Sequence, residues 1–132
     1  MIGLDTNVLL RYLTQDDTIQ SKIATDFITK YCTDETPGFI GHIVLCELVW
    51  VLESNYKQGK NTVILLIQEL LQISQLEILD SETVWRALHD FKNSNADFSD
   101  HLIGESNLVN GCTQTFTFDK KAGKQPSFKI LK

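Results

Sequence analysis

Short apolar runs alternate with longer segments of helical periodicity along this chain of 132 residues. Apolar positions spaced i, i+3, i+4 and i+7 predict helices, most clearly over 43–54. Further helices are expected over 8–13, from about 18 onward, over 63–71, after Asp80-Ser81, and over 98–110. Brief apolar runs predict strands at 2–4, 39–40, 76–79, 115–118 and 128–131. This alternation predicts one α/β domain over 1–132, with helices on both faces of a mainly parallel sheet of about five strands.

Two of these helices carry apolar positions that the pattern assigns to the core. In the second helix, Ile19, Ile23 and Phe27 recur at i, i+4 and i+8, with Ala24, Ile28 and Tyr31 beside them. In the helix 43–54, Trp50 and Val51 widen an already apolar face, so that we expect this helix to be mostly buried.

Composition narrows the class of protein. An apolar content of 42% and a charged content of 22% are ordinary for a globular domain. The net charge of −5 argues against a protein that holds nucleic acid by bulk electrostatics, but not against an enzyme that acts through bound cations. Cys32, Cys46 and Cys112 lack metal-ligand spacing and are interpreted as buried apolar side chains in a reducing compartment. With no signal peptide or membrane-spanning run, a cytoplasmic protein is expected.

Two aspartates come directly after predicted strands. Asp5 ends the first run, which we expect to be a buried, central strand, and Asp119 ends the strand 115–118. Ligands of open α/β sheets bind at the carboxyl ends of strands. The alternatives are structural: Asp5 as a helix N-cap that accepts a nearby backbone N–H, and Asp119 as a turn residue.

Three more carboxylates stand out by position. Glu47 lies within the most apolar predicted helix, where an unpaired Glu is rarely buried. Asp97 and Asp100 are spaced i, i+3 at the start of another helix, so both can face the same way. Asp97 is more simply explained as the N-cap, whereas Asp100 is a candidate site residue that Asp97 could assist.

Together these residues predict a metal site. Two Asp at strand ends, one Glu in a helix and one Asp at a helix start can converge on one crevice. Like charges ~5 Å apart repel by ~3 kcal/mol at an effective dielectric of ~20, so that the cluster must take up protons or cations. Oxygen-only sites suit Mg²⁺ or Mn²⁺, and two such ions can activate a water for attack on a phosphodiester.

Four segments carry a family resemblance: DTNVLLRYL, LCELVWVL, ADFSDHLIG and TFTFDK. In this order they resemble the PIN-domain ribonucleases, most of all the VapC toxins of bacterial type II toxin–antitoxin modules. The resemblance implies a parallel sheet of order 3-2-1-4-5, Mg²⁺- or Mn²⁺-dependent endoribonuclease activity, a homodimer, and a VapB-like antitoxin that plugs the site. It also implies residue roles: Asp5, Glu47, Asp100 and Asp119 as catalytic metal ligands, with Thr6, Asn7 and Thr117 as supporting polar residues.

Basic residues are candidates for contact with the RNA substrate. Arg11 is the one we assign to substrate binding. Lys120, Lys121 and Lys124 are also candidates, but are better explained as solvated surface charge. His101, next to Asp100, is interpreted as a surface residue rather than a substrate contact.

Other functions fit the pattern less well. A phosphatase of the haloacid dehalogenase type needs a second Asp two residues after the first, where this chain has Asn7. Asp80 and Lys120 match the strand-end Asp and Lys of a phospho-receiver domain only loosely. A degenerate PIN fold that acts as a protein-binding scaffold would have no reason to hold four like charges together.

Overall fold

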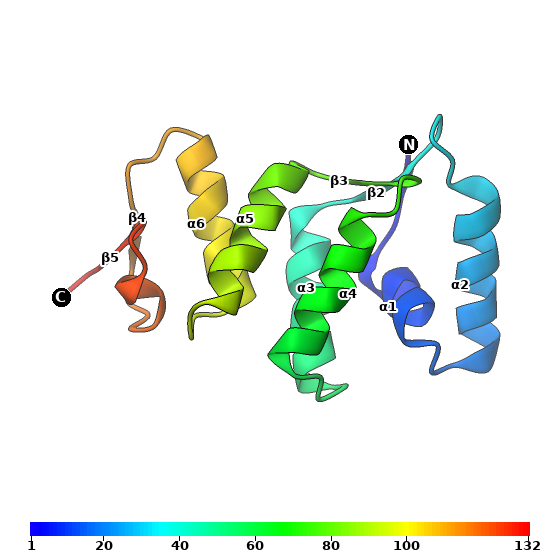
Figure 1. Cartoon of the computed structure of the whole chain (residues 1–132), viewed down its shortest axis with the longest axis horizontal. Helices are drawn as coiled ribbons and strands as arrows, with labels where there is room; N and C mark the ends of the chain where they lie inside the picture. Colours follow the sequence, from blue (N-terminus) through cyan, green and yellow to red (C-terminus); the bar gives the residue numbers. More distant parts are fainter. The chain divides into compact units, whose positions relative to one another are not determined.

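The predicted alternation of strands and helices is confirmed by the structure, a computed structural model that describes residues 1–132 (Figure 1). The chain falls into two compact units, Met1–Leu79 and Asp80–Lys132. The first contains β1 (Ile2–Gly3), α1 (Thr6–Thr14), α2 (Thr18–Tyr31), β2 (Gly38–Ile40), α3 (His42–Ser54), α4 (Lys60–Leu71) and β3 (Leu76–Ile78). The second contains α5 (Ser81–Lys92), α6 (Phe98–Val109), β4 (Thr115–Thr117), the 3-10 turn η1 (Ala122–Lys124) and β5 (Phe128–Ile130). None of the helices is long and apolar enough to cross a membrane.

The first unit is built on a parallel sheet of order β1-β2-β3. Gly38 lies where a side chain has no room: a Cβ atom there would come within 2.9 Å of both Cys32 Sγ and Leu76 Cδ2. The helices close the core over this sheet with fully buried aliphatic side chains. These are Leu9, Leu45, Leu48, Leu52, Val63, Ile67 and Leu70. Their spacing within each helix is the periodicity that predicted the helices.

The second unit pairs β4 with β5 in parallel, with Thr115 opposite Phe128. Helices α5 and α6 pack together, and the rings of Phe91 and Phe98 meet edge to face with centroids 5.9 Å apart. Gly104 brings α6 against β5, because a Cβ atom at this position would lie 2.5 Å from the Phe128 ring. Helix α6 is therefore held against β5 by packing within this unit.

The sheet differs from the expected single sheet of about five strands. The five strands are present, but they form a three-stranded and a two-stranded sheet. Within the first unit β1 bonds only to β2, and the order β1-β2-β3 agrees with the expected 3-2-1, so the central place of the first strand stays a prediction. Its apolar run indicated burial on both faces, but Gly3 and Met1 are exposed and the strand has only two residues.

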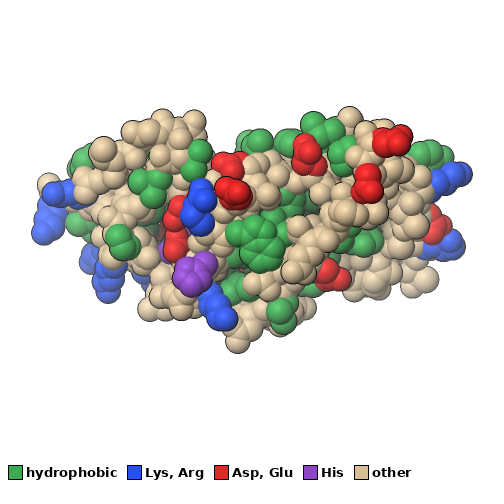
Figure 2. All heavy atoms as spheres, turned by 45° about the horizontal axis from the view of Figure 1, so that its top comes forward, with side chains coloured by type: hydrophobic (Ala, Val, Ile, Leu, Met, Phe, Trp, Pro, Cys, Tyr) green, Lys and Arg blue, Asp and Glu red, His purple; other side chains and the backbone are tan.

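Two predicted apolar faces are only partly buried. On α2, Ile19 and Ile23 are 74% and 63% exposed, and the buried positions are Ser21, Ala24 and Ile28. Small side chains let α2 approach α1 closely, so the wider apolar stripe turns outward. On α3, Trp50 is exposed, so this helix is less buried than expected. Hydrophobic side chains accordingly reach the surface in several places (Figure 2).

The three cysteines are free thiols in different surroundings. Cys32 is buried, and burial raises the pKa of its thiol. Cys46 is half-buried, whereas Cys112 is exposed, which corrects the expectation that all three are buried.

Candidate metal-binding site

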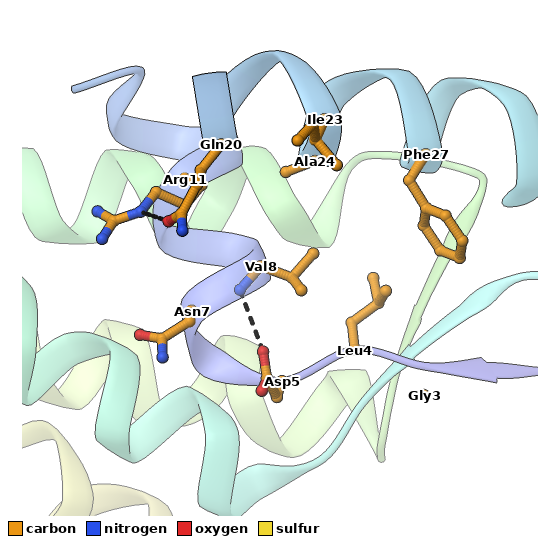
Figure 3. A pocket seen from close by; sticks show the side chains of 10 residues that line it. All are labelled: Gly3, Leu4, Asp5, Asn7, Val8, Arg11, Gln20, Ile23, Ala24 and Phe27. Carbon is orange, nitrogen blue, oxygen red and sulfur yellow. Dashed lines mark hydrogen bonds between the residues drawn. The ribbon is translucent and has the colours of Figure 1, made fainter. Parts of the chain in front are cut away.

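Asp5 begins α1 as its N-cap. Its Oδ1 accepts a hydrogen bond from the Val8 N–H at 3.1 Å, as the broken line in Figure 3 shows. The structural alternative for this residue is therefore confirmed. Asp5 is exposed, and a carboxylate has acceptor positions for about four partners, so one cap bond leaves room for a cation.

Glu47 is fixed by the residue that follows Asp5. The Thr6 side chain is buried, and its hydroxyl donates to Glu47 Oε1 in a short hydrogen bond. Glu47 is exposed on α3. The bond therefore holds Glu47 next to the N-terminus of α1, where Asp5 also lies. In unit 1, two residues at the N-terminus of α1, Thr6 and Val8, thus position the carboxylates of Glu47 and Asp5.

Asn7 and Arg11 lie beside Asp5 along a groove of about 570 Å³ between α1 and α2 (Figure 3). Its other walls are mainly apolar and include Val8, Ile23 and Phe27. The structure adds a second role to the one we predicted for Arg11, whose contact with substrate stays a prediction.

The Arg11 guanidinium forms a cluster at one end of this groove. It donates to Gln20 Oε1 at 2.7 Å, to the Tyr56 hydroxyl at 3.1 Å and to Asp16 Oδ1 at 3.3 Å. Hydrogen bonds from the hydroxyls of Thr14 and Tyr56 lower the pKa of Asp16 to about 2, with Arg11 adding to this effect. Arg11 thereby ties α1 to the start of α2 and to the segment after α3.

In the second unit, Asp97, Asp100, Asp119, Lys120 and Lys121 line one cavity of about 260 Å³. Asp97 is at the N-cap position of α6 as expected, but its side chain makes no capping hydrogen bond. Asp119 follows β4 and is held twice. Its Oδ1 accepts from the Ala122 N–H at 2.8 Å, and its own N–H donates to Thr117 Oγ1 at 2.9 Å. The three carboxylates thus line one cavity within one unit.

The neighbouring carboxylates affect the pKa of Asp100. Partial burial raises the pKa of its carboxyl, and the charges of Asp119 and Asp97 raise it further. A hydrogen bond from the Asp97 backbone N–H acts in the opposite direction. The ionised form of Asp100 is consequently disfavoured until a positive charge offsets its neighbours.

Two predictions for this region need correction or revision. His101 is 3% exposed, so its interpretation as a surface residue is wrong. Its Nε2 lies 2.5 Å from Ser94 Oγ, so the ring is buried in the core of this unit. Lys120 and Lys121, interpreted as solvated surface charge, line that cavity although they remain exposed. The available signal was their position directly after Asp119.

The residues predicted to bind metal are thus divided between the units. Unit 1 holds Asp5 and Glu47 with Thr6, and unit 2 holds Asp100 and Asp119 with Thr117. The structure contains no group of three or more His, Cys, Asp or Glu side chains that could hold a metal ion by itself. The convergence of all four carboxylates stays a prediction. Their donor chemistry, oxygen only, fits Mg²⁺ or Mn²⁺.

Comparison with known proteins identifies the family. The model of the PIN domain family matches residues 2–126, across both units. No curated protein matches the chain. PIN domains are generally nucleases that depend on divalent metals such as Mg²⁺. Because the match covers nearly the whole sequence, the chain belongs to the PIN domain family.

Proposed function

We propose that this PIN domain is an endoribonuclease that hydrolyses phosphodiester bonds with Mg²⁺ or Mn²⁺. The observation that carries the proposal is the cavity lined by Asp97, Asp100 and Asp119, where partial burial and then the charges of Asp119 and Asp97 raise the pKa of Asp100. A carboxylate in such surroundings is stabilised by a cation. The family match supplies the class of reaction, and the resemblance of the motifs to VapC toxins supplies RNA as substrate.

Each acidic residue has a role in this proposal. Asp5, Glu47 and Asp100 would hold one ion, and Asp119 would help to hold a second or would orient the attacking water. Asp97 shares the metal role with Asp100. Bound divalent cations would stabilise negative charge on the scissile phosphate and lower the pKa of a water molecule. The hydroxyl of Thr6 keeps Glu47 oriented, and Thr117 and Ala122 fix the position of Asp119.

We also propose that the chain is a VapC-like toxin of the cytoplasm, a homodimer neutralised by a VapB-like antitoxin. The resemblance of all four motifs supports this role. A net charge of −5 suits a basic inhibitory segment. The groove beside Asp5, with Val8, Ile23 and Phe27 in its walls, offers such a segment apolar surface next to a carboxylate (Figure 3). The runner-up function is a PIN scaffold without catalysis.

The test is cleavage of a pool of transfer and ribosomal RNA by the purified chain with Mg²⁺ or Mn²⁺. We expect discrete fragments that disappear with EDTA, and rates at least about 100-fold lower for Asp5→Asn and Asp100→Asn. Asp17→Asn is the matched control, because Asp17 caps α2 through the Gln20 N–H as Asp5 caps α1. Asn caps a helix as well as Asp, so both variants keep their helix start. Full activity in folded Asp5→Asn would refute the assignment, and neither cleavage nor metal binding would favour the scaffold.

A further inference from the structure

We propose that Lys120 and Lys121 bind a backbone phosphate of single-stranded RNA beside Asp100 and Asp119. This inference rests on the proposed nuclease function and adds positioning residues to the same site. It reassigns two side chains that the sequence alone favoured as solvated surface charge. The argument depends on how these lysines are carried, what surrounds their charges, and how they differ from their basic neighbours.

The backbone that carries the two lysines is anchored on both sides. The Asp119 side chain accepts the Ala122 N–H at 2.8 Å, and its carbonyl accepts the Gly123 N–H at 2.9 Å. Ala122 is completely buried. Lys120 and Lys121 therefore lie within a closed turn, and less conformational entropy is lost when their side chains engage a ligand than in a loose loop.

The two lysines are not in contact ion pairs with the carboxylates around them. Neither side chain forms a salt bridge, although three carboxylates line the same cavity. The cavity thus presents carboxylates and free ammonium groups together. A phosphodiester with its divalent cation matches both, because the carboxylates hold the cation and the ammonium groups hold the phosphate oxygens. A cavity of about 260 Å³ has room for such a group.

Other basic residues near the site lack this combination. Lys124 ends η1, the 3-10 turn that follows Lys121, and is exposed, but it does not line the cavity. Arg11 is already bonded to Asp16, Gln20 and Tyr56. Lys124 is therefore the matched control: it has the same side chain on the adjoining turn, without the acidic neighbours.

The test measures binding of a fluorescent single-stranded RNA to the full chain at several salt concentrations, in an Asp100→Asn background that does not cleave. Adding Lys120→Ala and Lys121→Ala should weaken binding about 5- to 20-fold and reduce the log–log salt slope by about 1.4, or about 0.7 per lost phosphate contact. Adding Lys124→Ala instead should change neither quantity. Lys120→Arg with Lys121→Arg should retain the slope, because the charges remain.

Kinetics of the otherwise unaltered chain give a second measurement. The Lys120→Ala, Lys121→Ala variant should raise KM about 5-fold or more, with a smaller change in kcat and an unchanged shift of Tm on adding Mn²⁺. The inference is overturned if this variant matches Lys124→Ala in affinity and salt slope, or if the chain binds no RNA. If RNA binds with the expected slopes but is not cleaved, the phosphate contact stands and the nuclease proposal fails. If RNA is cleaved while the Lys120→Ala, Lys121→Ala variant and Lys124→Ala have equal salt slopes, the nuclease proposal stands and the phosphate contact fails.

Discussion

The carboxylates of the two units are held in different ways. In unit 1, Asp5 and Glu47 are exposed, and each accepts a hydrogen bond from a neighbouring donor. In unit 2, Asp100 is half-buried between two other aspartates, and its pKa is raised. The first arrangement fixes where a ligand atom lies, whereas the second determines how strongly a cation is attracted. A metal-dependent nuclease needs both properties.

The largest expected effect comes from removing the donor in unit 1. Thr6→Val keeps the buried volume but deletes the hydroxyl that orients Glu47, so metal affinity or cleavage should fall about 10- to 100-fold. Mn²⁺ titration and initial cleavage rates measure this loss. Thr6→Ser should restore most of the activity, because it restores the hydroxyl.

Thr83→Val is the matched control for this change. Thr83 is also buried, and its hydroxyl donates to Asp80 Oδ2 at 2.6 Å, away from the predicted metal ligands. We expect cleavage by this variant to stay within about 2-fold of the parent. Equal losses in Thr6→Val and Thr83→Val would show that donors in unit 1 have no special part in positioning.

A smaller effect is expected in unit 2, where a substitution should raise stability instead of lowering activity. Because the pKa of Asp100 is raised in the folded chain, its ionised form costs stability once the pH exceeds the ordinary value near 3.8. Without metal, Asp100→Asn should therefore raise Tm at neutral pH by up to about 3 °C, less than about 1 kcal/mol after solvent screening. The gain should disappear below pH ~3.8, where both states are protonated. A lower Tm at pH 7 would contradict the crowding of these carboxylates.

The smallest effect should appear at acid pH in unit 1. Hydrogen bonds from Thr14 and Tyr56 lower the pKa of Asp16 to about 2, so this group contributes stability above pH ~3.8 that is lost as the pH falls toward 2. Asp16→Asn should flatten this part of the acid-unfolding curve, measured by circular dichroism, and Tyr56→Phe should flatten it less. Asp16 and Asp100 thus give opposite dependences on pH. An acid curve unchanged in both variants would remove this contrast between the units.

The sequence was sufficient for the elements and for the strand-end acids. Periodicity located the six helices to within a few residues, and Asp119 was found because it directly follows an apolar strand. Asp5 could be assigned both as cap and as candidate ligand, since both uses depend only on the boundary between β1 and α1. These features are local, and local features are encoded by adjacent residues.

The errors concern contacts between segments distant along the chain. An apolar stripe on α2 indicated a buried face, but small residues such as Ala24 decide which face packs on α1. His101 is buried because Ser94 offers it a partner in the preceding loop. Lys120 and Lys121 could be separated from Lys124 only once the turn carrying them was known. Periodicity shows that a face exists, whereas the neighbour that covers it depends on tertiary packing.

The N-cap at Asp5 has a consequence for how such a protein changes over generations. The side chain that we propose as a metal ligand also starts α1 through the Val8 N–H. Asn starts a helix equally well, and one nucleotide change converts an Asp codon into an Asn codon. On that proposal, a single mutation can remove a metal ligand without unfolding the chain. In this architecture the catalytic function is easier to lose than the fold.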